Sequence, residues 1–305
     1  MSKKVKVRVP ATITDIGPGF NSLSLAVGLY NYITIEETTK PGFFVTNLNE
    51  AVKLPSDENN AIVSVVKDFL IGKLNYKLKH GGIHITNDFH VPLNRGLNSL
   101  AVAVVGALIA SSVFADAEIY SEELLSLMRC YQSSPQNFAA TVIGGFVITS
   151  PVDESFVAHR IEFPEHLKMT LIIPEYDISV GDPSRLMAHK ISMKDAVFNI
   201  SRAALLISAL CQKNFKLLNL AMEDKLHQPF LRRKIPGAEE ISIIAKTCDN
   251  LGITMCGNGA TILIFHTQSC DTVIKRIERA YMAHKIKSRA VTVELDDRGG
   301  GLFDE

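Results

Sequence analysis

Residues 96–114, GLNSLAVAVVGALIASSVF, limit the fold of this chain more than any other stretch. The helix that this stretch predicts is apolar on nearly every face. Such a helix is stable in water only when other elements cover all of its sides. We therefore expect a buried helix here, entered through a turn at Gly96, with layers of structure packed around it.

The rest of the chain is large and apolar enough to supply those layers. Its 305 residues are 47% hydrophobic, and this length favours two domains over one. The 32 basic residues balance the 32 acidic ones, so no overall field favours binding to nucleic acid or to an anionic membrane. Any substrate must then be recognised locally.

Cysteine usage and the first residues indicate the compartment. The five cysteines lack C-x-x-C spacing, which disfavours a zinc cluster and a secreted disulfide framework and predicts free thiols. The start, MSKKVKVRVP, has no apolar signal region, and no stretch reaches the roughly 18 apolar residues of a membrane helix. These features predict a cytoplasmic protein.

Strand and helix patterns are mixed along the whole chain. Alternating stretches predict strands at residues 4–10, 31–37, 81–90, 143–150, 169–175, 261–267 and 290–296. Helical periodicity covers residues 60–74, 121–131, 194–210, 215–224, 237–249 and 271–284. Residues 11–29, which contain Gly-Pro-Gly, predict a strand, a loop and a short helix. The pattern starts afresh near residue 152, so we place one domain at 1–152 and a second at 153–305.

Three glycine-bearing turns carry the functional signal. They lie in VPATITDIGPGFNSLSLAVGLYN at 9–31, PLNRGLNSLAVAV at 92–104 and GITMCGNGATILIF at 252–265. One such turn alone is weak evidence, because every helix start offers N–H groups to an anion. In this order and at these separations, the three turns resemble the motifs of the GHMP kinases, most closely those of the homoserine kinase family.

The resemblance extends over nearly the whole chain. SPQNFAATVIGGFVI at 134–148, residues 194–210 and DKLHQPF at 224–230 are similar to further stretches of that family. It implies an α+β fold with a ribosomal-protein-S5-like N-terminal domain and a ferredoxin-like C-terminal domain. It also implies an ATP site at their junction and Mg²⁺-assisted phosphorylation of the L-homoserine hydroxyl, a step of threonine biosynthesis. The resemblance leaves a homodimer open.

Residue by residue, the resemblance implies roles for the following positions. Nucleotide-binding residues are Asn60, near the adenine, and Pro92, Arg95, Gly96, Leu97, Asn98, Ser99 and Leu100 around the phosphates. The expected metal ligands are Ser99 and Gln132, and the expected catalytic residues are Gln132, Asn137 and Arg185. Substrate-binding positions are Asp15, Asn21, Gln136, Asn137, Arg185, Arg232, Gly257 and Gly259.

Several of these positions depart from the family pattern. In the phosphate turn Asn98 replaces a glycine and Leu100 a serine, and Asn98 is the milder change because Asn tolerates positive φ. Gln132 replaces the glutamate that holds Mg²⁺, and an amide is a poorer ligand for this cation than a carboxylate. Gln136 replaces the aspartate expected to pair with the homoserine ammonium.

Other departures change the position of a group rather than remove it. Asp15 and Asn21 exchange the types that the family has at these two positions, so one carboxylate survives there. An expected arginine aligns with Leu231, but Arg232 follows at once. A rate falls by ~10²- to 10³-fold when one preorganised charge-stabilising group is lost, so these departures bear directly on activity.

Three functions therefore stay open at this stage. The first is a homoserine kinase with unusual ligands. The second is a catalytically impaired relative acting as a binding or regulatory module, and the third is a kinase with another small acceptor. His227 is expected to be structural rather than a base, and Cys256 a small filler rather than a nucleophile.

Overall fold

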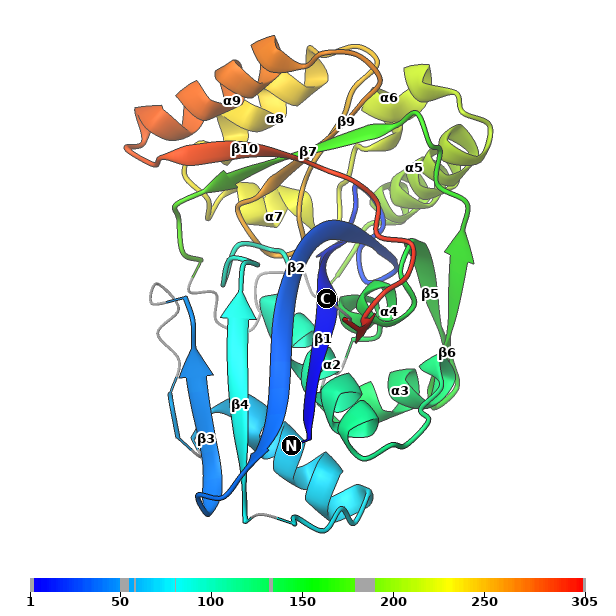
Figure 1. Cartoon of the computed structure of the whole chain (residues 1–305). Helices are drawn as coiled ribbons and strands as arrows, with labels where there is room; N and C mark the ends of the chain where they lie inside the picture. The colour runs from blue at the N-terminus through cyan, green and yellow to red at the C-terminus, as the bar shows by residue number, and fades with distance from the viewer. Residues whose placement is uncertain are drawn as a thin grey trace.

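The computed structural model describes residues 3–49, 55–57, 59–79, 81–131, 134–178 and 190–303. These residues form two β-sheets with helices packed on them, and Figure 1 shows one sheet below the other. The predicted α+β class is confirmed. Within this part of the chain no helix is both long and apolar enough to span a bilayer.

The first sheet contains the chain's N-terminal strands. Its strands are β1 (Lys4–Thr14), β2 (Leu23–Thr38), β3 (Gly42–Asn47), β4 (Gly82–Phe89), β5 (Phe146–Val152), β6 (Ser155–Ile161) and β11 (Gly301–Leu302). The main order is β11-β1-β2-β4-β3, with β5 pairing to the start of β2 and β6 to β5. All of these pairs are antiparallel except β3 with β4.

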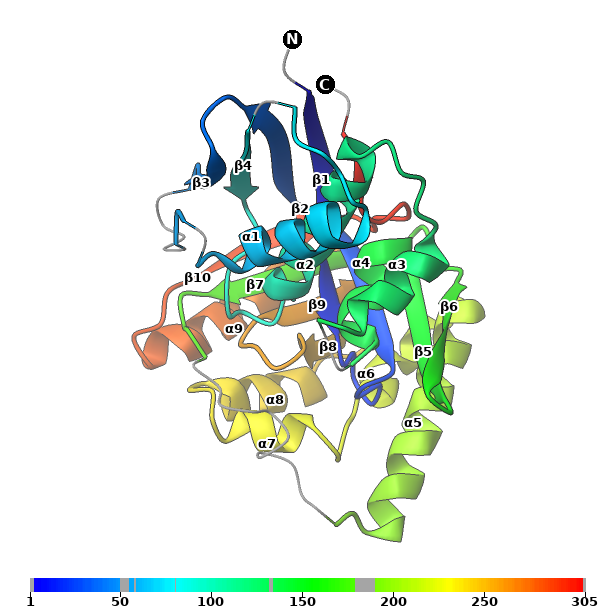
Figure 2. The ribbon, with the colours of Figure 1, turned by 90° about the horizontal axis from the view of Figure 1, so that it is seen from below.

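Helix α2 (Ser99–Phe114) is the buried helix that the apolar run predicts. It packs against β1 and β2, and 13 of its 16 residues are buried. Helix α1 (Ala61–Val66), its π-helical continuation η1 (Lys67–Lys73), α3 (Ser121–Met128) and α4 (Gln136–Ile143) surround it. Figure 2, seen from below, shows α1, α3 and α4 around α2 on one side of the first sheet. The prediction that layers must enclose this helix is confirmed.

The second sheet is antiparallel and four-stranded. Its order is β10 (Ser288–Val293), β7 (Lys168–Pro174), β9 (Ile262–His266) and β8 (Gly252–Met255). Helices α8 (Ala238–Lys246) and α9 (Asp271–Ala283) pack on one face and enclose a separate apolar core. Beside them lie α5 (Met193–Cys211), η3 (Phe215–Leu217), α6 (Leu218–Ala221) and α7 (Gln228–Arg232).

One sequence prediction about the first sheet is wrong. The short helix expected within residues 11–29 is absent, and a loop from β1 leads into β2 instead. Asp15, Gly17 and Asn21 all have positive φ, which a helix does not allow. Strands β3, β6, β8 and β11 and helices α4 and α7 have no counterpart among the predicted elements.

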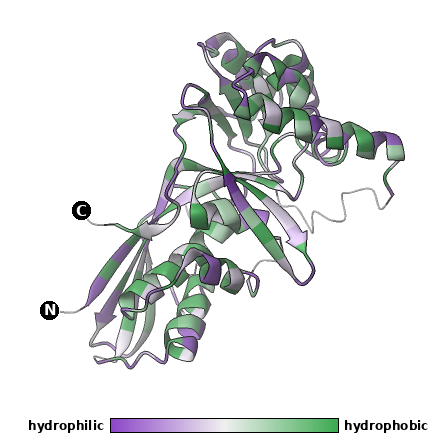
Figure 3. Cartoon of the chain, turned by 90° about the vertical axis from the view of Figure 1, so that its right-hand side faces the viewer, coloured by the Kyte–Doolittle hydropathy of each residue, from purple (hydrophilic) through white to green (hydrophobic). Residues whose placement is uncertain are grey.

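The chain crosses between the two sheets more than once. The hairpin of β5 and β6 still belongs to the first sheet, and after β10 the chain returns to pair β11 with β1. The first and last described strands, β1 and β11, therefore lie side by side in the first sheet, and Figure 3 marks N and C on the same side of the molecule. Figure 1 shows α8 and α9 on the other sheet. The division at residues 1–152 and 153–305 stays a prediction.

Candidate active site where three turns meet

The three glycine-bearing turns, far apart in the sequence, meet in space through backbone hydrogen bonds. The N–H of Gly257 donates to the carbonyl oxygen of Thr14 over 2.8 Å. The N–H of Thr261 donates to the carbonyl oxygen of Arg95 over 3.2 Å. The turn after β1, the turn before α2 and the turn between β8 and β9 thus form one junction between the two sheets.

Glycine is required at this junction by close backbone approach. A Cβ atom on Gly96, whose φ is +82°, would lie 1.9 Å from the carbonyl oxygen of Cys256. A Cβ atom on Gly259 would lie 2.1 Å from the nitrogen of Gly96. Since the obstructing atoms are backbone, neither glycine can be replaced without separating the two turns.

The start of α2 presents backbone N–H groups beside this junction. Asn98 precedes the helix in the left-handed conformation (φ 53°, ψ 36°). This conformation is expected for an asparagine that replaces a glycine of the family pattern. Its side-chain amide donates to the Thr12 hydroxyl over 3.1 Å and does not cap the helix. The first N–H groups of a helix have no partner within it, so this end of α2 suits an anion. We call residues 92–100 with the 257–259 turn the nucleotide side.

The two leucines of this turn have opposite environments. Leu97 is fully buried in the core, whereas 57% of Leu100 is exposed. The residue that most disturbs the family pattern thus lies at the surface. Its backbone N–H still belongs to the first turn of α2.

A second group of polar side chains gathers where α4 begins, and we call Asp15, Asn21, Gln136 and Asn137 the acceptor side. The amide nitrogen of Gln136 donates to Asn21 Oδ1 over 2.7 Å and to Asn137 Oδ1 over 3.5 Å. Gln136 is almost fully buried, and its oxygen Oε1 has no hydrogen-bond partner. A buried acceptor without a donor is energetically costly, and a ligand N–H would satisfy it.

Asp15 supplies a buried carboxylate next to this group. One of its oxygens accepts the backbone N–H of Asn21 over 2.8 Å and the other the Thr14 hydroxyl over 3.3 Å. Burial raises the pKa of Asp15, although the nearby His227 and the two hydrogen bonds act in the opposite direction. The carboxylate is thus tied to the backbone of its own turn.

His227 connects the acceptor side to the third turn. Its Nε2 lies 2.9 Å from Asn258 Oδ1, and its ring packs on Phe20 with centroids 4.6 Å apart. Its Nδ1 is buried without a partner. The ring thus holds two turns together, in agreement with a structural role.

Asp224 and Asn199 support His227, and sequence reasoning missed both. Asp224 accepts the backbone N–H groups of residues 226–228 at 2.6–2.9 Å, so it caps the turn that opens α7. The Asn199 amide donates to Asp224 over 2.6 Å. An aspartate just ahead of a short helix is the one signal that could have indicated this cap.

The side chains of the remaining predicted positions make contacts of their own or lie outside the described residues. Asn60 caps α1, accepting the N–H of Ile62 and donating to Pro55. Arg95 turns back on its own loop and lies 3.6 Å from Asp177. Arg232 lies under α8, where it contacts Ser242. Gln132 and Arg185 lie outside the described residues.

Cys256 lies in the third turn, where the sequence predicts a small filler rather than a nucleophile. The side chain is fully buried. Burial raises the pKa of its thiol above the ordinary value, so the thiol stays neutral and unreactive.

Comparison with known proteins agrees with this geometry. No family model matches the chain. A homoserine kinase from Persephonella marina is 30% identical over 300 residues, covering 98% of each chain, and one from Moorella thermoacetica is 33% identical over 260 residues, covering 85% of this chain and 86% of the relative.

Solved structures show the same fold. A homoserine kinase from Cytophaga hutchinsonii superposes with a TM-score of 0.84 at 22% identity, covering 99% of this chain and 98% of the other. A mevalonate kinase superposes with a TM-score of 0.72 at 17% identity, covering 96% of this chain and 100% of the other. The fold is therefore the two-domain α+β fold of the GHMP kinases, and from its sequence relatives the chain belongs to the homoserine kinase family.

Proposed function

We propose that the chain is an ATP-dependent kinase that phosphorylates the hydroxyl of L-homoserine. The observation that carries the proposal is the junction of the three turns, which sets an uncapped helix start beside a buried group of polar side chains. The relatives named homoserine kinase match almost the full chain, which favours an enzyme over a non-catalytic binding module.

On the nucleotide side, backbone groups would bind the phosphates. The N–H groups at the start of α2 and the turn at Gly96 offer donors that no side-chain substitution removes. Pro92, Arg95, Asn98, Ser99 and Leu100 stay the proposed neighbours of the phosphates, and Asn60 that of the adenine. Leu97, also expected there, lies in the core and supports the turn from inside. Phosphoryl transfer needs mainly positioning and charge neutralisation, and this arrangement provides part of both.

On the acceptor side, side chains would orient homoserine. The unpartnered Oε1 of Gln136 would accept an N–H of the substrate ammonium, replacing the carboxylate that the family has there. Asn21 and Asn137 complete this polar wall. Gly257 and Gly259, in the turn of the nucleotide side, stay proposed substrate-binding positions, and Arg185 is the proposed partner of the substrate carboxylate. The substrate hydroxyl oxygen bonds to the γ-phosphorus, ADP leaves, and the hydroxyl proton passes to solvent.

The metal is the part of the family chemistry that the described residues fit least. Within them no group of three or more His, Cys, Asp or Glu side chains forms a metal site. Ser99 opens α2 and offers a hydroxyl, while the only carboxylate of the acceptor side, Asp15, is buried and hydrogen-bonded to its own turn. Mg²⁺ usually keeps several waters and binds one or two carboxylates plus phosphates, so the described residues offer it little beyond the Ser99 hydroxyl.

A coupled assay of ADP formation tests the proposal. The full chain is supplied with ATP, Mg²⁺ and each of a panel of amino-acid and alcohol acceptors. ADP formation that depends on homoserine supports the proposal, whereas turnover with another acceptor only, or no turnover, contradicts it. A variant with Leu100→Ser, Gln132→Glu and Gln136→Asp, the residue types of the family pattern, measures how much rate the departures remove.

The homodimer and the cytoplasmic location stay proposals of the same kind. Sedimentation velocity of the full chain checks the first. Fractionation of cells that express the tagged chain checks the second.

A further inference from the structure

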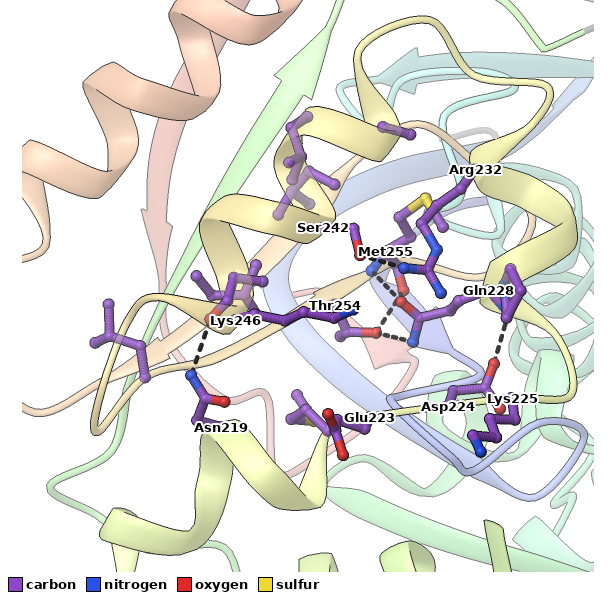
Figure 4. A pocket seen from close by; sticks show the side chains of 18 of the residues that line it. Asn219, Glu223, Asp224, Lys225, Gln228, Arg232, Ser242, Lys246, Thr254 and Met255 are labelled. Carbon is purple, nitrogen blue, oxygen red and sulfur yellow. Dashed lines mark hydrogen bonds between the residues drawn. The ribbon is translucent and has the colours of Figure 1, made fainter. Parts of the chain in front are cut away.

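A cavity of about 230 Å³ lies under α7 and α8, apart from the junction of the three turns. Its walls come from α6, α7, α8 and the edge strand β8, as Figure 4 shows. No residue of the acceptor side and no glycine of the junction lines it. The cavity is smaller than the ~300–1,000 Å³ pockets that take drug-sized ligands, so it fits a small metabolite.

One end of the cavity is cationic. Arg232 reaches into it from α7, and in Figure 4 its guanidinium lies beside the amide of Gln228. Its Nη1 donates to Ser242, its Nε is buried without a partner, and no carboxylate pairs with it within the described part of the chain. A guanidinium held among protein groups without an anion lacks its best partner, because Arg presents a planar fork that matches a carboxylate.

The other charges around the cavity do not neutralise Arg232. Glu223 pairs with Arg202 over 3.0 Å. The Asp224 carboxylate is occupied by the three backbone N–H groups that open α7. Lys246 is a further exposed cation on the lining. The unpaired charge therefore favours an anionic ligand.

The rest of the wall is aliphatic. It is formed by Met222, Ala238, Ile241, Ala245, Ile253 and Ile262. A ligand that satisfied both ends would have a carboxylate for Arg232 and a short apolar body for these side chains.

One residue of the cavity wall, Gln228, is hydrogen-bonded to the first glycine turn. Gln228 lines the cavity, and its amide donates to Thr254 Oγ1 over 2.6 Å and to the carbonyl oxygen of Gly17 over 3.3 Å. The N–H of Gly17 in turn donates to Thr254 Oγ1 over 3.1 Å. Asp15 and Asn21 belong to the same turn as Gly17, so a ligand that moves Gln228 acts on the acceptor side.

We propose that this cavity is a second ligand site, which binds a small aliphatic carboxylate through Arg232 and alters substrate binding through Gln228. This role replaces the substrate-binding role that the resemblance implies for Arg232. Binding in the cavity does not depend on the proposed kinase activity. Only the effect on homoserine rests on that function.

Calorimetric titration of the full chain without nucleotide tests the site. The probes are alanine, valine and leucine, their α-keto acids, and the matching amines that lack the carboxylate. We expect at least one carboxylate of this set to bind at one site per chain and the amines not to bind. Binding of no carboxylate at millimolar concentration, or equal binding of the amines, overturns the proposal.

Substitutions in and beside the cavity test whether the carboxylate binds there. Arg232→Gln is expected to weaken binding by about 10- to 100-fold, because it removes a charge-assisted hydrogen bond. Arg233→Gln is the matched control, since Arg233 is exposed and lies over Phe230 outside the cavity. Ala245→Leu fills part of the cavity, keeps Arg232 and should also weaken binding of the carboxylate. This variant tests the site independently if Arg232→Gln does not fold.

A further variant separates the cavity from the acceptor side. Binding that survives Gln136→Ala supports the cavity as the site. Binding lost in Gln136→Ala but retained in Arg232→Gln places the ligand on the acceptor side and overturns the proposal.

The coupling has its own measurement. The bound carboxylate should change the dissociation constant of homoserine by about 5-fold or more, and homoserine should change that of the carboxylate by the same factor. If the carboxylate binds but the homoserine affinity is unchanged, the role of Gln228 is wrong.

Discussion

The nucleotide side and the acceptor side of the candidate active site are built from different kinds of group. The nucleotide side consists of backbone, with two glycine turns in direct contact and the uncapped start of α2. The acceptor side consists of side chains that reach one another from α4 and from the turn after β1. The nucleotide side can therefore change its side chains and keep its backbone hydrogen-bond donors. The acceptor side loses its hydrogen-bonding groups when its side chains change.

This difference ranks the departures from the family pattern. Asn98 and Leu100 leave the path of the backbone intact, because Asn98 adopts the left-handed conformation and Leu100 points outward. Gln136 replaces a charged acceptor with a neutral one in a buried position, where the type of each polar atom matters. We therefore expect activity to depend most on the glycines of the nucleotide side and on the polar side chains of the acceptor side.

The largest effect is expected from Gly96→Ala. The new Cβ meets the Cys256 carbonyl oxygen at 1.9 Å and strains a backbone of positive φ, so the turns must separate. We expect a loss of about 2–4 kcal/mol in the free energy of unfolding and loss of kinase activity. Urea denaturation and the coupled assay measure both. In Gly301→Ala, where no atom lies within 4 Å of the new Cβ, both should stay unchanged.

Gln136→Ala should have the next largest effect. It removes the unpartnered acceptor and leaves Asn21 Oδ1 without its donor, so the KM for homoserine should rise by about 10- to 100-fold. The KM for ATP should stay unchanged, as should both values in the exposed control Gln212→Ala. Steady-state kinetics with each substrate varied in turn decides this, and a rise confined to the KM for ATP would contradict the division into two sides.

Asp15→Asn should change how stability depends on pH. Because burial raises the pKa of Asp15, the folded chain binds its proton more tightly than the unfolded chain does. The stability from this carboxyl is full below its ordinary pKa and is lost as pH rises through the raised value. We expect the variant to gain stability relative to the parent as pH rises through this window, in urea denaturation at a series of pH values.

The control for this measurement is Asp153→Asn. Asp153 is also an aspartate at positive φ, but it is exposed at a turn. A stability gain in Asp15→Asn that does not change with pH would contradict the role given to burial.

Leu100→Ser should have the smallest effect. More than half of this side chain is exposed, and the backbone N–H groups proposed to bind phosphate are unchanged, so we expect kcat to change less than about tenfold. Leu97→Ala, at the fully buried neighbour, should instead destabilise the chain by about 2–5 kcal/mol. If Leu100→Ser changed kcat a hundredfold, the nucleotide side would not be the backbone site described above.

The elements that could be predicted from the sequence are those whose apolar pattern is long. The run at 96–114 predicts α2 because it is long and almost entirely apolar, and the pattern at 194–210 predicts α5 because many side chains repeat the same period. Strand β8 has only four residues, too few to show alternation. The false helix after β1 has apolar spacing, but three positive φ values end any helix there.

The candidate site was predictable as a set of turns but not as a set of contacts. The glycines could be identified because close backbone approach restricts the residue type. The pair of Gln136 and Asn21 lies 115 residues apart in sequence, and nothing local to either residue indicates the other. Arg232 is similar, since the direction of its side chain depends on how α7 packs on α8.

The return of the chain to its first strand has a consequence for synthesis. On its outer edge β1 pairs with β11, which comes almost 300 residues later in the chain. A nascent chain emerging from the ribosome would expose that edge until the last segment arrives. Long-range pairing of this kind slows folding, and an open strand edge invites contact with other chains. Helper proteins that shield β1 during translation would act on the earliest part of the molecule for the longest time.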